Sequence, residues 1–212
     1  HFIPLLITNS EGILVKEANR YHDVRTYYLP ELVREIRPLK DIIALYKIWQ
    51  ILRKEKRETP HVPLVIHTHS SKAGILGRWA AKFARVCQII HSIHGFGFHA
   101  YQSPIIRYTF IVLERITSKI TTHFIAVSSA NIETGIRLGV FSRDRVSLIR
   151  SGIDIACFQK ASYHSTGTMQ NSRETILQEL QIPVHKKIIG MIACFKPQKA
   201  PLDFIRVMQR VS

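Results

Sequence analysis

Residues 65–99 read VIHTHSSKAGILGRWAAKFARVCQIIHSIHGFGFH, and this stretch decides the fold. Short apolar runs at 64–66 and 89–93 predict two strands. Between them, Ser70 or Ser71 can cap the start of a helix. That helix carries a face of small residues that could lie close on a sheet: Gly74, Gly77, Ala80, Ala81 and Ala84. Strand, helix and strand in this order predict two parallel strands joined by a right-handed crossover.

The same alternation extends outward in both directions. Further strands are expected at 2–8, 24–29, 122–127, 146–149 and, as a buried strand, 187–193. Helices are expected at 15–21, 41–56 (capped by Asp41), 128–138 and 174–180, and from Ser103 and Ala200 onward. This pattern predicts an α/β fold with a parallel sheet, in which the strands at Leu64, Ile89 and Thr122 are neighbours. His69 and His94 should then line one crevice at the strand ends.

The chain is strongly basic. Its 212 residues include 30 Lys and Arg against 15 Asp and Glu, which gives a formal net charge of +15. Such an excess indicates a polyanionic partner (nucleic acid, an anionic membrane or a phosphorylated substrate) or else a solvated basic surface. No apolar run reaches the ~18 residues that a membrane span needs. The cysteines Cys87, Cys157 and Cys194 lack metal-ligand spacing and are expected to be buried thiols in a reducing compartment.

Positive residues and histidines gather around the central stretch. Between Thr59 and Leu113 there is no Asp or Glu, but there are five fixed cations: Lys72, Arg78, Lys82, Arg85 and Arg107. Five histidines fall within residues 65–99: His67, His69, His91, His94 and His99. This composition favours an anionic ligand at the strand ends, although satisfied structural histidines would explain it too. His67 and His69 share a face of an extended chain, but no Cys or carboxylate nearby completes a zinc site, so no metal is expected.

Five short motifs occur in one order along the chain: HTHSSKAG at 67–74, HGFGFH at 94–99, VSSAN at 127–131, RSGID at 150–154 and KPQK at 196–199. Taken together, this ordered set resembles the family-4 glycosyltransferases of the GT-B fold, most closely bacterial members that build surface glycans. The resemblance implies a Rossmann-like N-terminal domain and the start of a second Rossmann-like domain. It also implies that the family's pattern extends beyond this sequence at both ends, so that these residues alone are expected to be inactive.

The resemblance assigns roles to individual residues. His94 matches the family's histidine beside the donor sugar and is the expected catalytic residue. Lys199 matches a lysine that holds the donor diphosphate, and Lys196 is the candidate second cation, because Cys194 stands where the family has an arginine. The residues expected to line the cleft or contact the acceptor come from the first two motifs: His69, Ser70, Lys72, Gly95, Phe96 and Gly97. Phe96, Phe98 and Tyr101 could pack within their loop or face a lipid.

The resemblance also divides the chain. Residues 1–152 are expected to form the acceptor-side domain, with its first strand missing, residues 153–186 a hinge and linker, and residues 187–212 the start of the nucleotide-sugar domain. The expected location is cytoplasmic, with peripheral attachment to the inner face of the plasma membrane through the basic surface and the 96–101 loop as the candidate anchor.

The expected function is that of a retaining glycosyltransferase in surface polysaccharide synthesis. It would move a sugar from a nucleotide-diphosphate sugar to a glycan or polyprenyl-linked acceptor, without a cofactor or metal. A sugar-nucleotide epimerase of the same fold is one alternative, and a basic nucleic-acid-binding module is another. No Gly-x-Gly-x-x-Gly follows a strand, which gives a nicotinamide-binding function no support. The aromatic residues cluster in one loop instead of alternating with cations, so nucleic acid is not the expected partner.

Overall fold

The computed structural model describes residues 3–99, 101–156, 175–183, 188–196 and 199–211. The chain forms two units, residues 1–150 and residues 151–212, and each is treated by itself below. The first unit holds all six strands of the described part of the chain and most of its helices. The candidate site is therefore sought mainly in this first unit.

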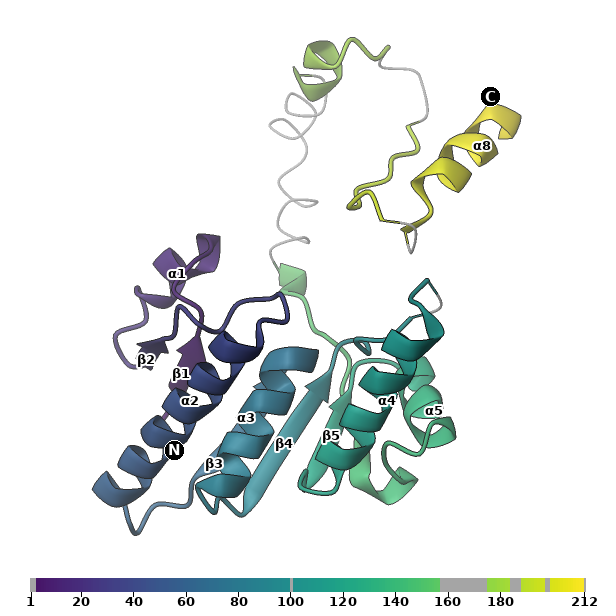
Figure 1. Ribbon diagram of the computed structural model, residues 1–212. Helices are drawn as coiled ribbons and strands as arrows, with labels where there is room; N and C mark the ends of the chain where they lie inside the picture. The colour runs from purple at the N-terminus through teal and green to yellow at the C-terminus, as the bar shows by residue number, and fades with distance from the viewer. Residues whose placement is uncertain (1–2, 100, 157–174, 184–187, 197–198, 212) are drawn as a thin grey trace. The chain divides into compact units, whose positions relative to one another are not determined.

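In the first unit, strands and helices alternate as predicted (Figure 1). The strands are β1 (Leu5–Thr8), β2 (Arg25–Tyr28), β3 (Val65–His69), β4 (Gln88–Ile93), β5 (His123–Ala126) and β6 (Val146–Leu148). The helices are α1 (Ile13–Ala18), α2 (Pro38–Glu58), α3 (Ser71–Phe83), α4 (Pro104–Ser118), α5 (Ser129–Arg137) and the short 3-10 turn η1 (Arg143–Arg145). The α/β prediction is confirmed, and each expected strand from 2 to 149 is present within a few residues of its predicted bounds.

The strands form two parallel sheets. One has the order β3-β4-β5-β6, and the other pairs β1 with β2. The predicted neighbours at Leu64, Ile89 and Thr122 are confirmed, since β3 pairs with β4 and β4 with β5. The separate β1–β2 pair was not predicted, because alternation along a chain does not reveal which strands share hydrogen bonds. Both sheets nevertheless contribute to one apolar core, in which Ile7 and Leu29 join Leu52, Ala81 and Ile89.

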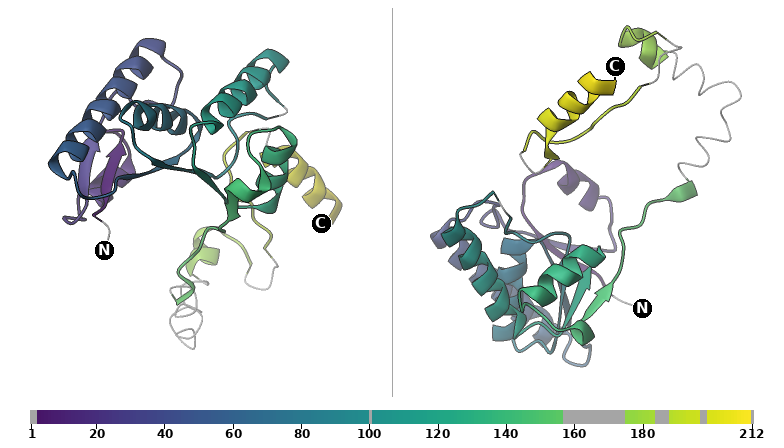
Figure 2. Two further views of the ribbon diagram at one scale, coloured as in Figure 1. Left: turned by 90° about the horizontal axis from the view of Figure 1, so that it is seen from below. Right: turned by 90° about the vertical axis from the view of Figure 1, so that its right-hand side faces the viewer.

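Helices α2, α3 and α4 lie side by side on one face of the larger sheet (Figure 2). The small-residue face of α3 explains how closely it approaches the strands. A Cβ added at Gly74 would lie 2.5 Å from His91 Cε1, and one at Gly77 would lie 2.9 Å from Thr68 Cγ2. Because side chains alternate along a strand, the buried Thr68 faces α3 while His67 and His69 face the other way and are exposed.

The helix starts can be compared with the residues expected at them. The helix expected from Ser103 begins there, and the helix expected from 128 begins at Ser128; each serine accepts a hydrogen bond from a backbone amide three residues on. Ser70 occupies the cap position of α3, but its side chain makes no capping hydrogen bond. Asp41 does not cap α2, which begins three residues earlier because Pro38 suits the first helical position. Its carboxylate instead accepts a hydrogen bond from the Arg37 amide at 3.1 Å.

In the second unit, the described residues include helical segments and no strand. Residues 175–179 are helical within the predicted 174–180, and α8 (Pro201–Val211) follows Ala200 as predicted. The buried strand predicted at 187–193 is wrong for the residues that can be described, since 188–193 are exposed and have no regular structure. An apolar segment becomes a buried strand only when neighbouring strands pair with its backbone, and none of the strands in the described part of the chain pairs with residues 188–193.

Replacing Gly74 with Ala tests the close packing of α3. The new methyl group would overlap the buried His91 ring, and overpacking of this kind costs about 1–3 kcal/mol, against about 1 kcal/mol gained in helix propensity. We expect a net fall in the free energy of unfolding, measured by urea denaturation. Gly152→Ala is the control, because nothing lies within 4 Å of its added Cβ. Equal stability of the two variants would contradict the packing described here.

Candidate functional site

Three histidines meet at the carboxyl edge of β3 and β4. His69 Nδ1 lies 3.0 Å from His94 Nε2, and the two rings are stacked with centroids 5.3 Å apart. The His67 ring is 4.3 Å from that of His69, and its Nε2 lies 2.8 Å from Ser92 Oγ. The register sets His69, the last residue of β3, opposite Ser92, two positions before His94. The predicted meeting of His69 and His94 is therefore confirmed.

The surroundings of His67 and His69 disfavour a charge on either imidazole ring. Partial burial lowers the pKa of His67, and a charge on nearby His94 would lower it further. Burial also lowers the pKa of His69, with His67 and His94 adding to the effect. Neutral imidazoles can donate one hydrogen bond and accept one, which suits contact with hydroxyl groups better than capture of a fully charged phosphate.

The loop after β4 is fixed by its own contacts. Gly95 has a φ of +159°, and Gly97 leaves no room for a side chain, because an added Cβ would lie 2.6 Å from Ser71 Oγ. The Phe96 and Phe98 rings stack with centroids 4.6 Å apart. Phe98 is buried, so this pair serves packing within the loop, which was one of the two alternatives. His94 is thus presented on a defined backbone.

A cavity of about 790 Å³ opens where β1 and α3 approach each other. Its walls are the end of β1 and the following turn, residues 32–36, the start of α3, Gly97 and Phe110. Among the predicted cleft residues, Ser70, Lys72 and Gly97 line this cavity. His69, His94, Gly95 and Phe96 do not belong to the lining found among the described residues. The walls from 8–11 and 32–36 were missed, because nothing in those segments signals a site in the sequence.

The five predicted cations do not converge on the strand ends, which corrects that expectation. Lys72 lines the cavity, but its ammonium group is paired with the Asp41 carboxylate and donates to the Glu35 carbonyl oxygen. Lys82 and Arg85 lie at the opposite end of α3, and Arg107 is exposed on α4. The absence of carboxylates between 59 and 113 was misleading, since Asp41 and Glu114 supply the missing charges from outside that window.

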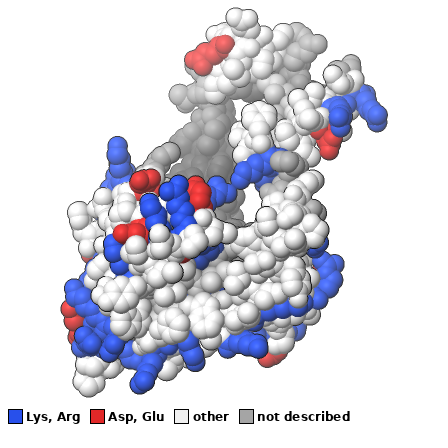
Figure 3. Space-filling model, in the orientation of Figure 1, with Lys and Arg blue, Asp and Glu red and all other residues white. Residues whose placement is uncertain are grey.

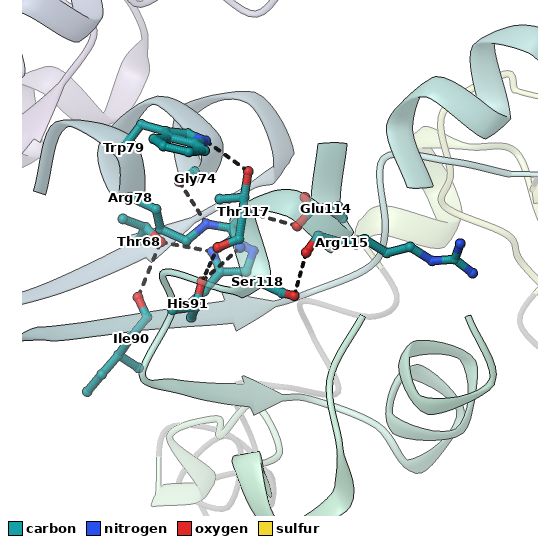
Figure 4. A network of polar contacts seen from close by, with 11 residues as sticks. Thr68, Gly74, Arg78, Trp79, Ile90, His91, Glu114, Arg115, Thr117 and Ser118 are labelled. Atoms are coloured by element: carbon teal, nitrogen blue, oxygen red, sulfur yellow. Dashed lines mark hydrogen bonds and ion pairs between the residues drawn. The ribbon is translucent and has the colours of Figure 1, made fainter. Parts of the chain in front are cut away.

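Arg78 differs most clearly from the expectation that these cations face an anionic ligand. Its side chain is fully buried and forms a 2.8 Å ion pair with Glu114, as Figure 4 shows. Its Nε donates to the Gly74 carbonyl at 3.0 Å, and the neighbouring Trp79 Nε1 donates to Thr117 Oγ1 at 3.1 Å. Glu114 shares the buried side of α4 with Ile111, Thr117 and Ser118, at helical spacing. That lone acid within an apolar stripe was a signal that a buried cation would face it.

His91 is buried beside Arg78 and does not line the cavity described above. Its Nδ1 lies 2.9 Å from Thr68 Oγ1, and the Thr68 hydroxyl donates to the Ile90 carbonyl at 3.2 Å. Burial, reinforced by the charge of Arg78, lowers the pKa of His91 to about 3. This histidine is therefore a neutral structural residue that helps to hold α3 on the sheet.

The predicted donor lysines lie in the second unit. Lys196 and Lys199 are exposed and adjacent, with the Lys199 amide donating to the Lys196 carbonyl at 2.9 Å. The cysteine prediction is corrected for Cys87 and Cys194, which are exposed, and Cys157 lies outside the described residues. The described residues contain no group of three or more metal-ligating side chains. In the same part of the chain, no helix is long and apolar enough to cross a membrane.

Comparison with known proteins adds a family and a relative. The pattern of the family described as Glycosyltransferase Family 4 matches residues 5–156. A relative from Escherichia coli is named UDP-Gal:alpha-D-GlcNAc-diphosphoundecaprenol alpha-1,3-galactosyltransferase, and it is 31% identical over 198 residues. The aligned region covers 91% of this chain and 48% of the relative, so the chain spans about half the relative's length.

The lowered pKa of His91 predicts how stability depends on pH. Its ordinary pKa of 6.5 applies to the unfolded chain, which therefore binds a proton that the folded chain refuses down to about pH 3. Acidification between these values favours the unfolded state, at about 1.4 kcal/mol per pH unit for one proton. Between pH 6.5 and about pH 5, His91 should lower the free energy of unfolding by about 2 kcal/mol.

Urea denaturation across this range, for the parent chain and for His91→Gln, measures that contribution. The variant should be less stable at neutral pH but should lose less stability on acidification. His22→Gln replaces an exposed histidine and serves as the control. Its free energy of unfolding should depend on pH as that of the parent chain does. If His91→Gln loses stability as steeply as the parent, His91 is not held neutral by its surroundings.

Proposed function

Because the chain belongs to glycosyltransferase family 4, we propose that it forms part of a retaining glycosyltransferase that acts in surface polysaccharide synthesis. The enzyme would move a sugar from a nucleotide-diphosphate sugar to a lipid-linked glycan acceptor. The observation that carries this proposal is the 31% identity to the galactosyltransferase, which extends over 91% of this chain. That relative's name gives UDP-Gal and a diphosphoundecaprenol-linked sugar as its substrates, and we propose substrates of the same two classes here.

In this proposal His94 contacts the donor sugar. The residue stands at the carboxyl edge of the sheet, is exposed, and is oriented by the 3.0 Å contact between its Nε2 and His69 Nδ1. That contact leaves Nδ1 of His94 for the substrate. A histidine held by a neighbour in this way can position a sugar hydroxyl without the entropy cost of ordering a free side chain. His69 is then a positioning residue that acts through His94.

The departing nucleotide diphosphate needs positive charge, and we propose that Lys199 and Lys196 supply it. Both residues are exposed, and the Lys199 amide donates a hydrogen bond to the Lys196 carbonyl. Cations placed at the leaving group stabilise charge that develops in the transition state, and this requires no metal ion. Cys194 stands where the family has an arginine and provides no positive charge, so Lys196 would be the second cation at the diphosphate.

The acceptor would enter through the 790 Å³ cavity beside the start of α3. Ser70, Lys72 and Gly97 line it, and their hydroxyl, ammonium and backbone groups offer hydrogen bonds to a glycan. Because the Lys72 ammonium group is already paired with Asp41, we propose that it shapes the wall and does not grip a phosphate. A lipid-linked acceptor also implies work at a membrane surface, and a net charge of +15 fits peripheral attachment to the anionic inner face.

Substitution of His94 and Lys199 tests these roles in the enzyme that carries this chain. His94→Ala should lower kcat on the order of 10²-fold, as loss of a group acting at the reacting centre does, with little change in the donor KM. Lys199→Ala should raise the donor KM roughly tenfold, because a bound diphosphate loses one charge-assisted contact. Initial rates with a radiolabelled nucleotide sugar and a polyprenyl-diphosphate-linked sugar give both constants.

His61→Ala, which removes an exposed histidine that precedes the amino end of β3, at the opposite end of that strand from His69, is the matched control and should leave both constants unchanged. The anomeric configuration of the product, read by NMR, separates retention from inversion. Conversion of the nucleotide sugar in the absence of acceptor would instead identify an epimerase. Parent-like kinetics in both His94→Ala and Lys199→Ala would remove the assigned site.

A further inference from the structure

A second cavity, which is basic, lies at the other end of α3 from the histidine cluster. It has a volume of about 470 Å³ and is lined by Arg53, Lys56, Arg57, Phe83, Ala84 and Arg85. Four of these six residues are fixed cations, and none carries a carboxylate. Because α3 begins at the carboxyl edge of the strands and ends at the opposite edge, this cavity is separate from the strand-end site.

The cations are placed by the backbone. Arg53 and Arg57 are four residues apart on α2, so they share one face of that helix. Arg53 is further held over the Trp49 ring, with its Cζ 5.1 Å from the ring centroid. Arg85 has a φ of +56°, in the left-handed region that favours glycine. At the end of α3, the Val86 amide donates to the Ala81 carbonyl at 2.9 Å. Lys56 Nζ donates to the Arg85 carbonyl at 2.8 Å.

The carboxylates of α2 do not neutralise this cluster. Glu55 is buried and accepts hydrogen bonds from Arg25 Nη1 and the Tyr27 hydroxyl at 2.8–2.9 Å. Glu58 forms 3.8 Å ion pairs with Arg25 and Lys54. Among the described residues, no ion pair is found for Arg53, Arg57 or Arg85. In Figure 3, Lys and Arg gather at the lower left, over the carboxyl ends of α2 and α3, with few Asp or Glu residues among them.

We propose that this basic cavity is a phosphate-binding site. Guanidinium groups pair with phosphate oxygens through two parallel hydrogen bonds, and two arginines on one helix face beside a third on a turn can surround such a group. The ligand class is a phosphate ester or diphosphate. Phe83, which is 55% exposed at the cavity, and Tyr46 and Trp49 beside Arg53 on α2 provide apolar surface, which favours the phosphate of an anionic phospholipid over a soluble phosphate.

Two probes test the site on the 212-residue chain. Calorimetric titration with inorganic diphosphate measures binding of the phosphate group alone. Co-sedimentation with phosphatidylglycerol vesicles, compared with phosphatidylcholine vesicles, measures binding of the same group on a lipid surface. The test variant is Arg53→Gln with Arg57→Gln, and its unfolding curve without ligand shows whether it folds like the parent. The control is Arg137→Gln with Arg143→Gln, which removes the same charge from two exposed positions elsewhere.

We expect the test variant to bind at least one probe no less than tenfold more weakly than the parent, while the control stays within twofold. Loss seen only with phosphatidylglycerol vesicles identifies a lipid headgroup as the source, and loss seen with diphosphate identifies a soluble ligand. A Lys199→Ala chain, which alters the proposed donor site, should keep the binding seen at the cavity. Absence of binding to both probes, or equal loss in test and control variants, overturns the proposal.

Discussion

The ion pair between Arg78 and Glu114 is the interaction on which the rest of the first unit depends. A guanidinium group with no solvent contact is tolerated only when a carboxylate and further acceptors satisfy it, and removing one partner of such a pair typically costs about 3–5 kcal/mol. Here burial lowers the pKa of Arg78 while Glu114 opposes that shift. The pair joins α3 to α4, and Arg78 also donates to the Gly74 carbonyl, beside the His91 ring of β4. Both charged groups are buried, so their role is to hold α3 and α4 together.

Much of this architecture could be predicted from the sequence because it rests on local signals. Apolar runs of strand length, serine caps at Ser103 and Ser128, and small residues along one face of α3 each act within a few positions of one another. The meeting of His69 and His94 followed as well, since parallel neighbours end at one edge. Pairing between distant residues could not be predicted: Lys72 with Asp41 and Arg78 with Glu114 are separated by 31 and 36 positions. Lys72 and Arg78, which were expected to face an anionic ligand, are therefore paired with carboxylates of the protein itself.

Strand pairing and burial explain the remaining differences. The segment at 187–193 has the composition of a buried strand, but no described strand pairs with residues 188–193, and these residues are exposed. The separation of β1 and β2 from the larger sheet likewise reflects hydrogen bonds that periodicity does not specify. Of the site, the cleft residues at Ser70, Lys72 and Gly97 were predicted, whereas the opposite wall at 8–11 and 32–36 was not, because it is built from turns without a chemical signature. The basic cavity at the end of α3 escaped notice for a related reason, since its arginines come from two segments.

The contact between His69 Nδ1 and His94 Nε2 couples the proton positions of the two rings. When both are neutral, one hydrogen lies between them, and each ring carries a single N–H. If His69 donates, the hydrogen of His94 must be on Nδ1, which then offers a donor to a bound molecule. If His94 donates, its Nδ1 is bare and offers an acceptor. A sugar hydroxyl, which can both give and take a hydrogen bond, is compatible with either tautomer, whereas a fully ionised phosphate oxygen is compatible with only one. The pair can therefore accommodate a hydroxyl group in either tautomer.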